Sequence, residues 1–271
     1  MKLHAISGTP RSGSTLLCNI LNQNPAFHAS STSCIAHSVR ALSNLWSNSP
    51  EIKSDLINNQ LHCEERMVRA IRALIVAWYE DEDANIIFDK GRLWNHQALT
   101  LKQIAPEAHM FVCVRDPRDI LASIEKQHAK NPLLDTATSP QELTLSVRVE
   151  SNCEPGGIVG QQIDGIVDLM KRQLSFVHAI EFETLVNHPQ RVMDSIYKVL
   201  EVEPFDHDFT DVKNTATDVD GLYHNKFPHE GSGAVTPPTG SWKDHLPADL
   251  AAQVMQRFAG YNRVFGYQPG T

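Results

Sequence analysis

The chain has 271 residues, of which 41% are hydrophobic, so it is long enough to bury a full core as one domain. It contains no apolar run of about eighteen residues, and we therefore expect no membrane span. The formal net charge of −8, from 24 basic and 32 acidic residues, argues against nucleic acid or an anionic membrane as the main partner. It does not argue against an anionic cofactor, because a few arginines are enough to make the electrostatic potential of a pocket positive.

The cysteines and histidines indicate the redox compartment and whether a metal site is expected. Five cysteines are an odd number, no CxxC pair occurs, and the N-terminus runs straight into an apolar segment. We therefore expect a reduced, cytoplasmic protein without a signal peptide. The 13 histidines show no HxH or HExxH spacing, so we expect no metal site.

The first informative segment is 6–17, which reads Ile-Ser-Gly-Thr-Pro-Arg-Ser-Gly-Ser-Thr-Leu-Leu. An apolar run precedes it and helical spacing follows it, which predicts strand, loop and helix. Backbone N–H groups at such a helix start bind phosphate. The frame fits the loop GxxxxGK[ST] of nucleoside-triphosphate enzymes, except that Ser14 replaces the lysine. Arg11 supplies the positive charge instead, and its planar guanidinium group can donate hydrogen bonds to two oxygens of an anion at once.

A second candidate anion site begins about a hundred residues later. The apolar run 109–114 predicts a buried strand that ends at Arg115. Pro117 suits the first turn of a helix, and Ser123 lies two turns into it. A charged residue at the carboxyl end of a parallel strand points into the ligand crevice.

Together these two segments resemble the sulfotransferases that use 3′-phosphoadenosine 5′-phosphosulfate. The segment Thr9–Leu17 is similar to their 5′-phosphosulfate loop, and the segment 114–123 to their 3′-phosphate motif. The resemblance implies that the 5′-phosphosulfate is bound by a set of loop residues: Arg11, Ser12, Gly13, Ser14 and Thr15. It implies that Arg115 and Ser123 hold the 3′-phosphate.

The segment 28–33 departs from the family pattern. Relatives that resemble tyrosylprotein sulfotransferase carry a glutamate here, which deprotonates the acceptor, whereas this chain reads His-Ala-Ser-Ser-Thr-Ser. The alternative interpretation is a Ser/Thr-rich entry to a helix. Residues 35–80 are predicted to be mostly helical.

The apolar run 85–88 predicts a third strand, which leads to Lys90. The family often has a lysine here, near the transferred group, and Lys90 matches that position. The charges of Lys90 and Arg11 would then offset the charge on the leaving phosphate, so both are candidate catalytic residues. Because the glutamate is missing, we take His96 as the first candidate for the catalytic base and His28 as the second.

The rest of the chain adds two possible nucleotide contacts. The segment 182–189 resembles the family segment whose aromatic residue lies beside adenine, which assigns Phe182 to that role. The segment 239–246 resembles a late Gly-x-Trp-Lys element that closes over the nucleotide, and Lys243 then reaches the phosphates. Helices are expected over 163–174, 191–200 and 248–260.

A fourth strand is expected over 176–183, and four apolar strands separated by helical stretches predict an α/β fold. We expect a single domain over 1–271, with a mostly parallel sheet flanked by helices. Insertions on the acceptor side are expected at about 30–80 and 128–160, the latter as a long connection with weak periodicity.

The sequence therefore predicts a sulfotransferase that moves the sulfonate of 3′-phosphoadenosine 5′-phosphosulfate to a hydroxyl or amine by in-line transfer, without a metal. The acceptor is a small molecule or a peptide. Two alternatives stay open. One is a P-loop kinase, disfavoured by Ser14. The other is a nucleotide-binding protein that has lost catalysis.

Overall fold

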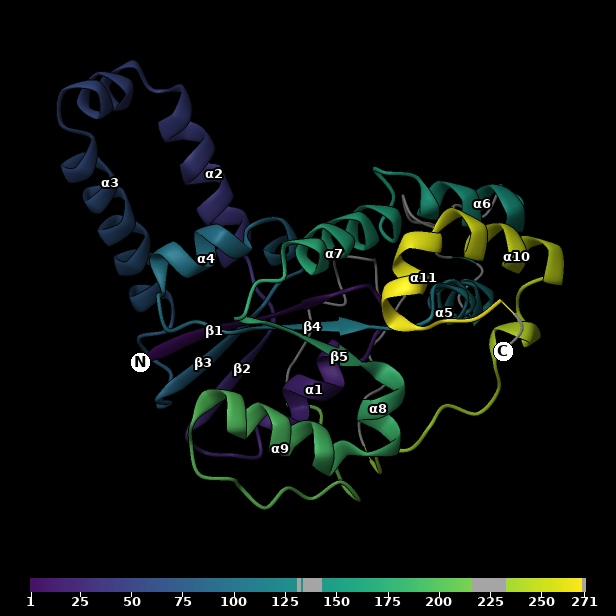
Figure 1. The fold of residues 1–271 in the computed structure, drawn as a ribbon. Helices are drawn as coiled ribbons and strands as arrows, with labels where there is room; N and C mark the ends of the chain where they lie inside the picture. Colours follow the sequence, from purple (N-terminus) through teal and green to yellow (C-terminus); the bar gives the residue numbers. More distant parts are fainter. Residues whose placement is uncertain (131–132, 134–142, 216–232, 270–271) are drawn as a thin grey trace.

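The computed structural model describes residues 1–130, 133, 143–215 and 233–269 (Figure 1). The strands are β1 (Lys2–Gly8), β2 (Phe27–Thr32), β3 (Ile86–Lys90), β4 (Met110–Val114) and β5 (Val177–Glu181). The α-helices are α1 (Ser14–Leu21), α2 (Ile35–Asn48), α3 (Pro50–Trp78), α4 (Ala98–Ile104), α5 (Pro117–Lys130), α6 (Leu145–Cys153), α7 (Gly160–Arg172), α8 (Phe182–Asn187), α9 (Pro189–Leu200), α10 (Ala248–Arg257) and α11 (Ala259–Phe265). Among the described residues, the short 3₁₀ helices are η1 (Arg92–His96) and η3 (Trp242–Asp244).

The five strands form one parallel sheet in the order β2-β3-β1-β4-β5, which confirms the predicted fold class. The strand β1 lies in the middle and is buried from Leu3 to Gly8, as its near-continuous apolar run predicts. In a parallel sheet all carboxyl ends lie at one edge. The loops after β1, β3 and β4 therefore start side by side.

The strand β2 was not predicted, because the segment was interpreted as a loop or a helix entry. It pairs with β3 and lies at the edge of the sheet. Only Phe27 and Ala29 are buried, so the strand has no continuous apolar run to reveal it. The side chain of Asn22 accepts from the N–H of Ala29 (2.6 Å) and donates to its carbonyl oxygen (3.0 Å), which satisfies backbone groups that would otherwise pair with a further strand.

Helices cover both faces of the sheet (Figure 1). The helices α1, α8 and α9 lie on one face, and their core includes Leu17 and Ile196. The helices α5, α7, α10 and α11 lie on the other face, where the core includes Val112 and Ile163. The carboxyl edge of the sheet lies between these two layers.

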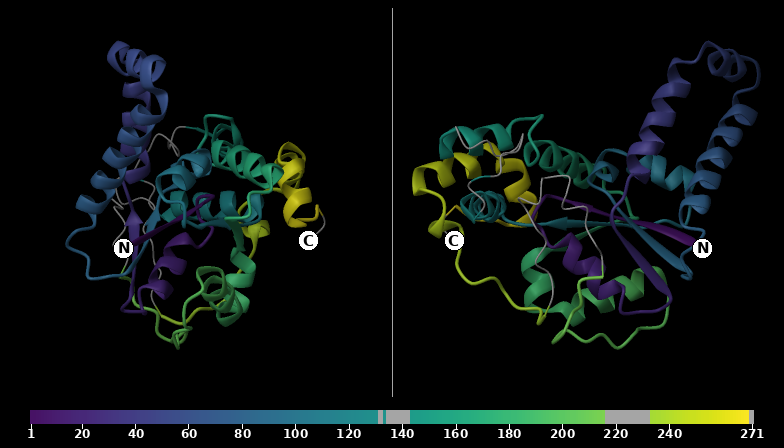
Figure 2. Two further views of the ribbon diagram at one scale, coloured as in Figure 1. Left: turned by 60° about the vertical axis from the view of Figure 1, so that its left-hand side comes forward. Right: turned by 180° about the vertical axis from the view of Figure 1, so that it is seen from behind.

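The segment 35–80 is helical, as predicted, and its helices α2 and α3 project from the body as an antiparallel pair (Figure 2). The segment 128–160 is more regular than predicted, because α5 continues to Lys130 and α6 spans Leu145–Cys153. Positions 131–132 and 134–142 of this segment lie outside the described residues. Within the described residues, no helix is long and apolar enough to cross a membrane. All five cysteines are free thiols.

Three histidines meet at the amino end of the sheet. Nδ1 of His4 accepts from the backbone N–H of His109 (3.0 Å), and Nδ1 of His109 lies 3.0 Å from Nε2 of His178. Burial is the main cause that lowers the pKa of His4 to about 3 and that of His178 to about 4, and it also lowers the pKa of His109. The cluster is therefore stable only in the neutral form.

We expect acid to destabilise the protein through His4. Between pH 6.5 and about 3 the unfolded chain binds a proton at this site that the folded chain excludes, so the free energy of unfolding falls as the pH falls. The loss from His4 alone is about 2 kcal/mol at pH 5. Urea unfolding from pH 7.5 to 5 of His4→Gln should show a shallower pH slope than wild type. His37→Gln, an exposed residue of α2, is the control. Equal slopes for His4→Gln and wild type would contradict this.

Gly8 ends β1 in a close approach to β4. Its φ of +146° is rare for residues with a side chain, and a Cβ there would lie 2.2 Å from the carbonyl oxygen of Cys113. Gly8→Ala should therefore lower the free energy of unfolding by about 3 kcal/mol or more, as expected for forced backbone strain. The control is Gly156→Ala, whose Cβ would meet nothing within 4 Å. Similar urea midpoints for the two variants would show that β1 and β4 tolerate separation here.

Candidate active site

The loop between β1 and α1 has the predicted strand–loop–helix form. Gly13 caps α1 with a left-handed φ of 82°, and Arg11 also has a positive φ, 58°. The hydroxyl of Ser12 donates to the carbonyl oxygen of Thr9 (2.7 Å), which fixes the turn. This conformation leaves the N-terminus of α1 facing a cavity, as an anion site requires.

Arg11 connects this loop to the second motif. Its Nε donates to the hydroxyl of Ser123 on α5 (3.1 Å), and its carbonyl oxygen accepts from Nη1 of Arg115 (3.0 Å). The two motifs predicted from separate parts of the sequence therefore meet in one place. Asp116, a possible partner of Arg115, pairs instead with Arg118 (2.6 Å).

Phe182 lies on the first turn of α8 and covers both motifs. The guanidinium of Arg115 lies 4.2 Å from the centre of its ring, a cation–π contact. A Cβ on Gly13 would lie 2.7 Å from the same ring, so the loop needs glycine there. The predicted stacking residue is thus part of the site.

Asp119 links the second motif to the late Gly-x-Trp-Lys segment. One of its carboxylate oxygens accepts from the backbone N–H of Trp242 (2.9 Å), while the guanidinium of Arg118 lies 5.0 Å from the Trp242 ring. Trp242 therefore packs against α5. Lys243 is exposed, its Nζ lies 5.5 Å from the Trp242 ring, and it is not among the described residues that line the cavity.

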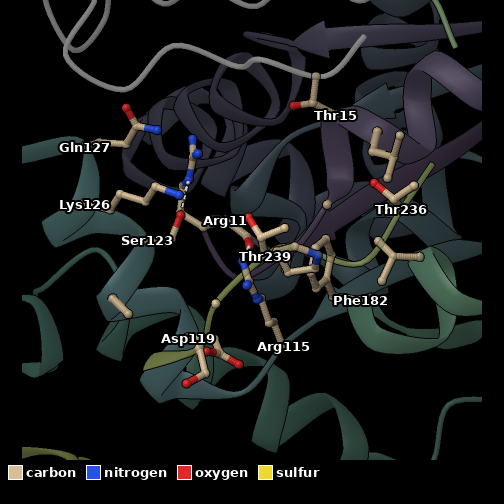
Figure 3. Close-up of a pocket in the computed structure, with 18 of the residues that line it drawn as sticks. Arg11, Thr15, Arg115, Asp119, Ser123, Lys126, Gln127, Phe182, Thr236 and Thr239 are labelled. Carbon is tan, nitrogen blue, oxygen red and sulfur yellow. Dashed lines mark hydrogen bonds between the residues drawn. The ribbon is translucent and has the colours of Figure 1, made fainter. Parts of the chain in front are cut away.

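The loop after β1, the second motif and Phe182 line a cavity of about 490 Å³ (Figure 3). Its wall combines the loop 11–16, one face of α5, Phe182 and the segment 233–245. Figure 3 shows Arg11 and Ser123 on one side and Phe182 on the other, with Arg115 and Asp119 towards one end. The cavity thus contains every predicted nucleotide contact except Lys243.

The charges of the wall favour an anion. Among the described lining residues four are basic and two are carboxylates, in a chain whose net charge is −8: Arg11, Arg115, Lys126 and Lys130 against Asp119 and Asp244. Burial lowers the pKa of Arg115 and raises that of Asp119, and the attraction between these two side chains opposes both shifts. Nε of Arg115 is buried and has no partner among the described residues. A bound phosphate would satisfy that donor.

Lys90 is buried behind this cavity. Its Nζ donates to the hydroxyl of Thr15 (2.7 Å), which itself lines the cavity. Its backbone N–H donates to the hydroxyl of Ser30 on β2 (2.9 Å). Its position at the end of β3 places the cation beside Thr15, on the first turn of α1.

The two candidate bases lie elsewhere. His96 is exposed and packs against α7, because a Cβ on Gly165 would lie 2.7 Å from its ring. His28 lines a second cavity, of about 660 Å³, and its Nδ1 is paired with Glu82 (2.8 Å). The strand register pairs His28 with Ile87, three residues before Lys90 and so roughly 10 Å along the sheet. Neither imidazole lines the cavity that Arg11 and Arg115 line.

Sequence reasoning missed three features of the site. Asp119 has no role in the sequence-based prediction, because its contact with Trp242 spans 123 positions. Lys126 and Gln127 line the cavity from α5, and their spacing of three and four residues from Ser123 was the available signal. Asp89, next to Lys90, is buried and accepts from Tyr79 and from Trp94 Nε1 (2.6 Å). Burial raises the pKa of Asp89, and this group ties α3 to β3.

The fold resembles those of solved sulfotransferases. The sulfotransferase domain from the Synechococcus PCC 7002 olefin synthase is 19% identical with a TM-score of 0.56, over 98% of this chain and 95% of that one. The domain from the curacin biosynthetic pathway is 16% identical with a TM-score of 0.54, over 98% of both chains. Mouse sulfotransferase SULT7A1, complexed with PAP, is 12% identical with a TM-score of 0.55, over 97% and 84%. No curated protein matches the chain.

The family assignment rests on a sequence model. Residues 5–207 match the model of the sulfotransferase family. The match contains the loop 9–17, Lys90 and the motif 114–123, the same segments that converge on the cavity in the structure. The chain therefore belongs to the sulfotransferase family, and it is a sulfotransferase.

Proposed function

We propose that this sulfotransferase uses 3′-phosphoadenosine 5′-phosphosulfate as donor and transfers its sulfonate to a hydroxyl or amine by in-line attack. The observation that carries the proposal is the junction of Arg11, Ser123 and Arg115. It brings two anion-binding motifs from two strand ends to one cavity. A donor with a 3′-phosphate and a 5′-phosphosulfate needs two such sites.

The donor is held by groups of matching chemistry. The backbone N–H groups of the loop 11–15 and the side chain of Arg11 take the 5′-phosphosulfate. Arg115 and Ser123 take the 3′-phosphate, which satisfies the unpaired Nε of Arg115. Phe182 offers a ring face to adenine from the opposite wall. The PAP bound to SULT7A1 is the product that such a donor leaves, which supports this choice.

Lys90 acts on the transfer itself. As the bond between sulfur and the bridging oxygen breaks, negative charge grows on the leaving phosphate, and a cation beside it stabilises the transition state. Nζ of Lys90 is already held by Thr15 and lies in the interior, where charge interactions are strong. Lys243, exposed in this structure, would need a movement of the segment around η3 to reach the phosphates.

The proton of the acceptor is not taken by the usual glutamate, since 28–33 contains no carboxylate. His96 and His28 are both placed away from the donor cavity, so a direct role for either is not favoured by geometry. An acceptor acidic enough to lose its proton to solvent, or one that carries its own base, fits this site better.

Arg115→Ala should weaken binding of adenosine 3′,5′-bisphosphate about 10- to 150-fold, which corresponds to the roughly 1.5–3 kcal/mol of a lost charged hydrogen bond. Adenosine 5′-monophosphate lacks the 3′-phosphate, so its affinity should hardly change. Isothermal titration of both nucleotides checks this. Equal losses for the two ligands would remove the 3′-phosphate assignment.

Lys90→Met should lower kcat about 10²-fold or more, because one preorganised electrostatic contact is lost in the transition state, while donor affinity changes much less. The exposed Lys198 of α9 supplies the control variant Lys198→Met. Rates are measured with a confirmed acceptor and a labelled donor. An unchanged kcat would make Lys90 a structural residue. Tight nucleotide binding by wild type without transfer to any acceptor would instead favour the catalytically silent alternative.

A further inference from the structure

The wall of the donor cavity continues along α5 beyond Ser123. Lys126 and Gln127 follow Ser123 by three and four positions, so all three lie on one face of the helix, and all three line the cavity (Figure 3). Gln127 lies about 6 Å further along the helix axis than Ser123. This part of the wall is not needed to explain either phosphate site.

Gln127 is the informative member. Its side chain is only 5% exposed, and its carbonyl oxygen Oε1 is buried without a hydrogen-bond partner among the described residues. A buried acceptor of this kind costs free energy until a donor reaches it. Ionised phosphate and sulfonate oxygens only accept hydrogen bonds, so these groups of the nucleotide do not satisfy Oε1. A ligand with an O–H or N–H group does.

Lys126 adds a charge requirement at the same place. Lys126 lies about one helical turn from Ser123 on α5, and its ammonium group has no hydrogen bond or ion pair with any described residue. Figure 3 shows it on the same side of the cavity as Gln127. A cation and an unsatisfied acceptor oxygen on the same wall of a cavity suit a ligand that carries both an anionic group and a hydrogen-bond donor.

We propose that Lys126 and Gln127 form a subsite for the acceptor, and that this acceptor carries an anionic group, such as a carboxylate, next to a hydroxyl or amine. The inference rests on the proposed function, because it takes the nucleotide to occupy Arg11, Ser123 and Arg115. The anion binds Lys126, and the neighbouring O–H or N–H group donates to Oε1 of Gln127. The acceptor class is therefore anionic and polar, as in a hydroxy acid.

The test uses the full chain saturated with adenosine 3′,5′-bisphosphate, so that the phosphate sites are filled. Glycolate, which combines a carboxylate with a hydroxyl, and glycolamide, its neutral counterpart, serve as probes in ligand-observed saturation-transfer NMR. The wild type should bind glycolate at least 5-fold more tightly than glycolamide. Lys126→Met should abolish this preference. Gln127→Glu, which repels the anion, should weaken glycolate at least 5-fold and leave glycolamide within 2-fold.

Controls separate this subsite from its neighbours. Lys198→Met should behave as wild type, and Lys90→Met should keep the preference, because Lys90 belongs to the sulfonate position. Equal binding of the two probes by wild type, loss of the preference only in Lys90→Met, or its retention in Lys126→Met would overturn the proposal. A 10-fold loss of nucleotide affinity in Lys126→Met would assign Lys126 to the nucleotide instead. Failure of the wild type to bind the bisphosphate is a separate result, and it would overturn the proposed function.

Discussion

The candidate site depends on the parallel pairing of β1 with β4. The register pairs Gly8 with Cys113, so the chain leaves both strands at the same height and in the same direction. Arg11 and Arg115 follow within a few residues on each side, and their backbone and side chains then meet. The absence of a side chain at Gly8 is what permits this approach, because any Cβ there would overlap the neighbouring strand.

The electrostatics of the site follow from this geometry. A chain with a net charge of −8 places arginines and lysines in one cavity, and the anion-binding groups are backbone amides and guanidinium groups rather than a loop lysine. The Arg115 side chain lies between the Phe182 ring and the loop, which holds its charge in place before any ligand binds. Asp119 and Asp244 are the exceptions among the described lining residues, because they are carboxylates in an anion cavity. The contact of Asp119 with the backbone of Trp242 explains its presence as a link to the segment that borders the cavity.

The arrangement also separates the two tasks of a transferase. The proposed donor contacts follow β1 and β4 or lie on α5, whereas Lys90 ends β3, which lies on the other side of β1 from β4. The edge strand β2 lies beyond it and is held to Lys90 by Ser30. In the proposed arrangement, the acceptor would approach the sulfonate from the part of the cavity wall that Lys126 and Gln127 form on α5.

Much of this protein was determined by sequence patterns that act locally. Apolar runs predicted four strands of the sheet, namely β1, β3, β4 and the edge strand β5. The pattern of glycine, serine and arginine in 6–17 predicted the phosphate loop. Such features depend on neighbours in the chain, so local physics suffices. The resemblance to sulfotransferases added the roles of Arg115, Ser123 and Lys90.

Only the tertiary structure decided the rest. The strand β2 exists because β3 offers it a pairing edge, although its own residues are mostly polar. His96 packs against Gly165 of α7, 69 positions away, and His28 pairs with Glu82, 54 positions away. Local sequence patterns carry no information over such separations. The role proposed for Gln127 depends on burial, which removes water from its side-chain oxygen. On an exposed helix the same oxygen would be solvated and would need no other donor.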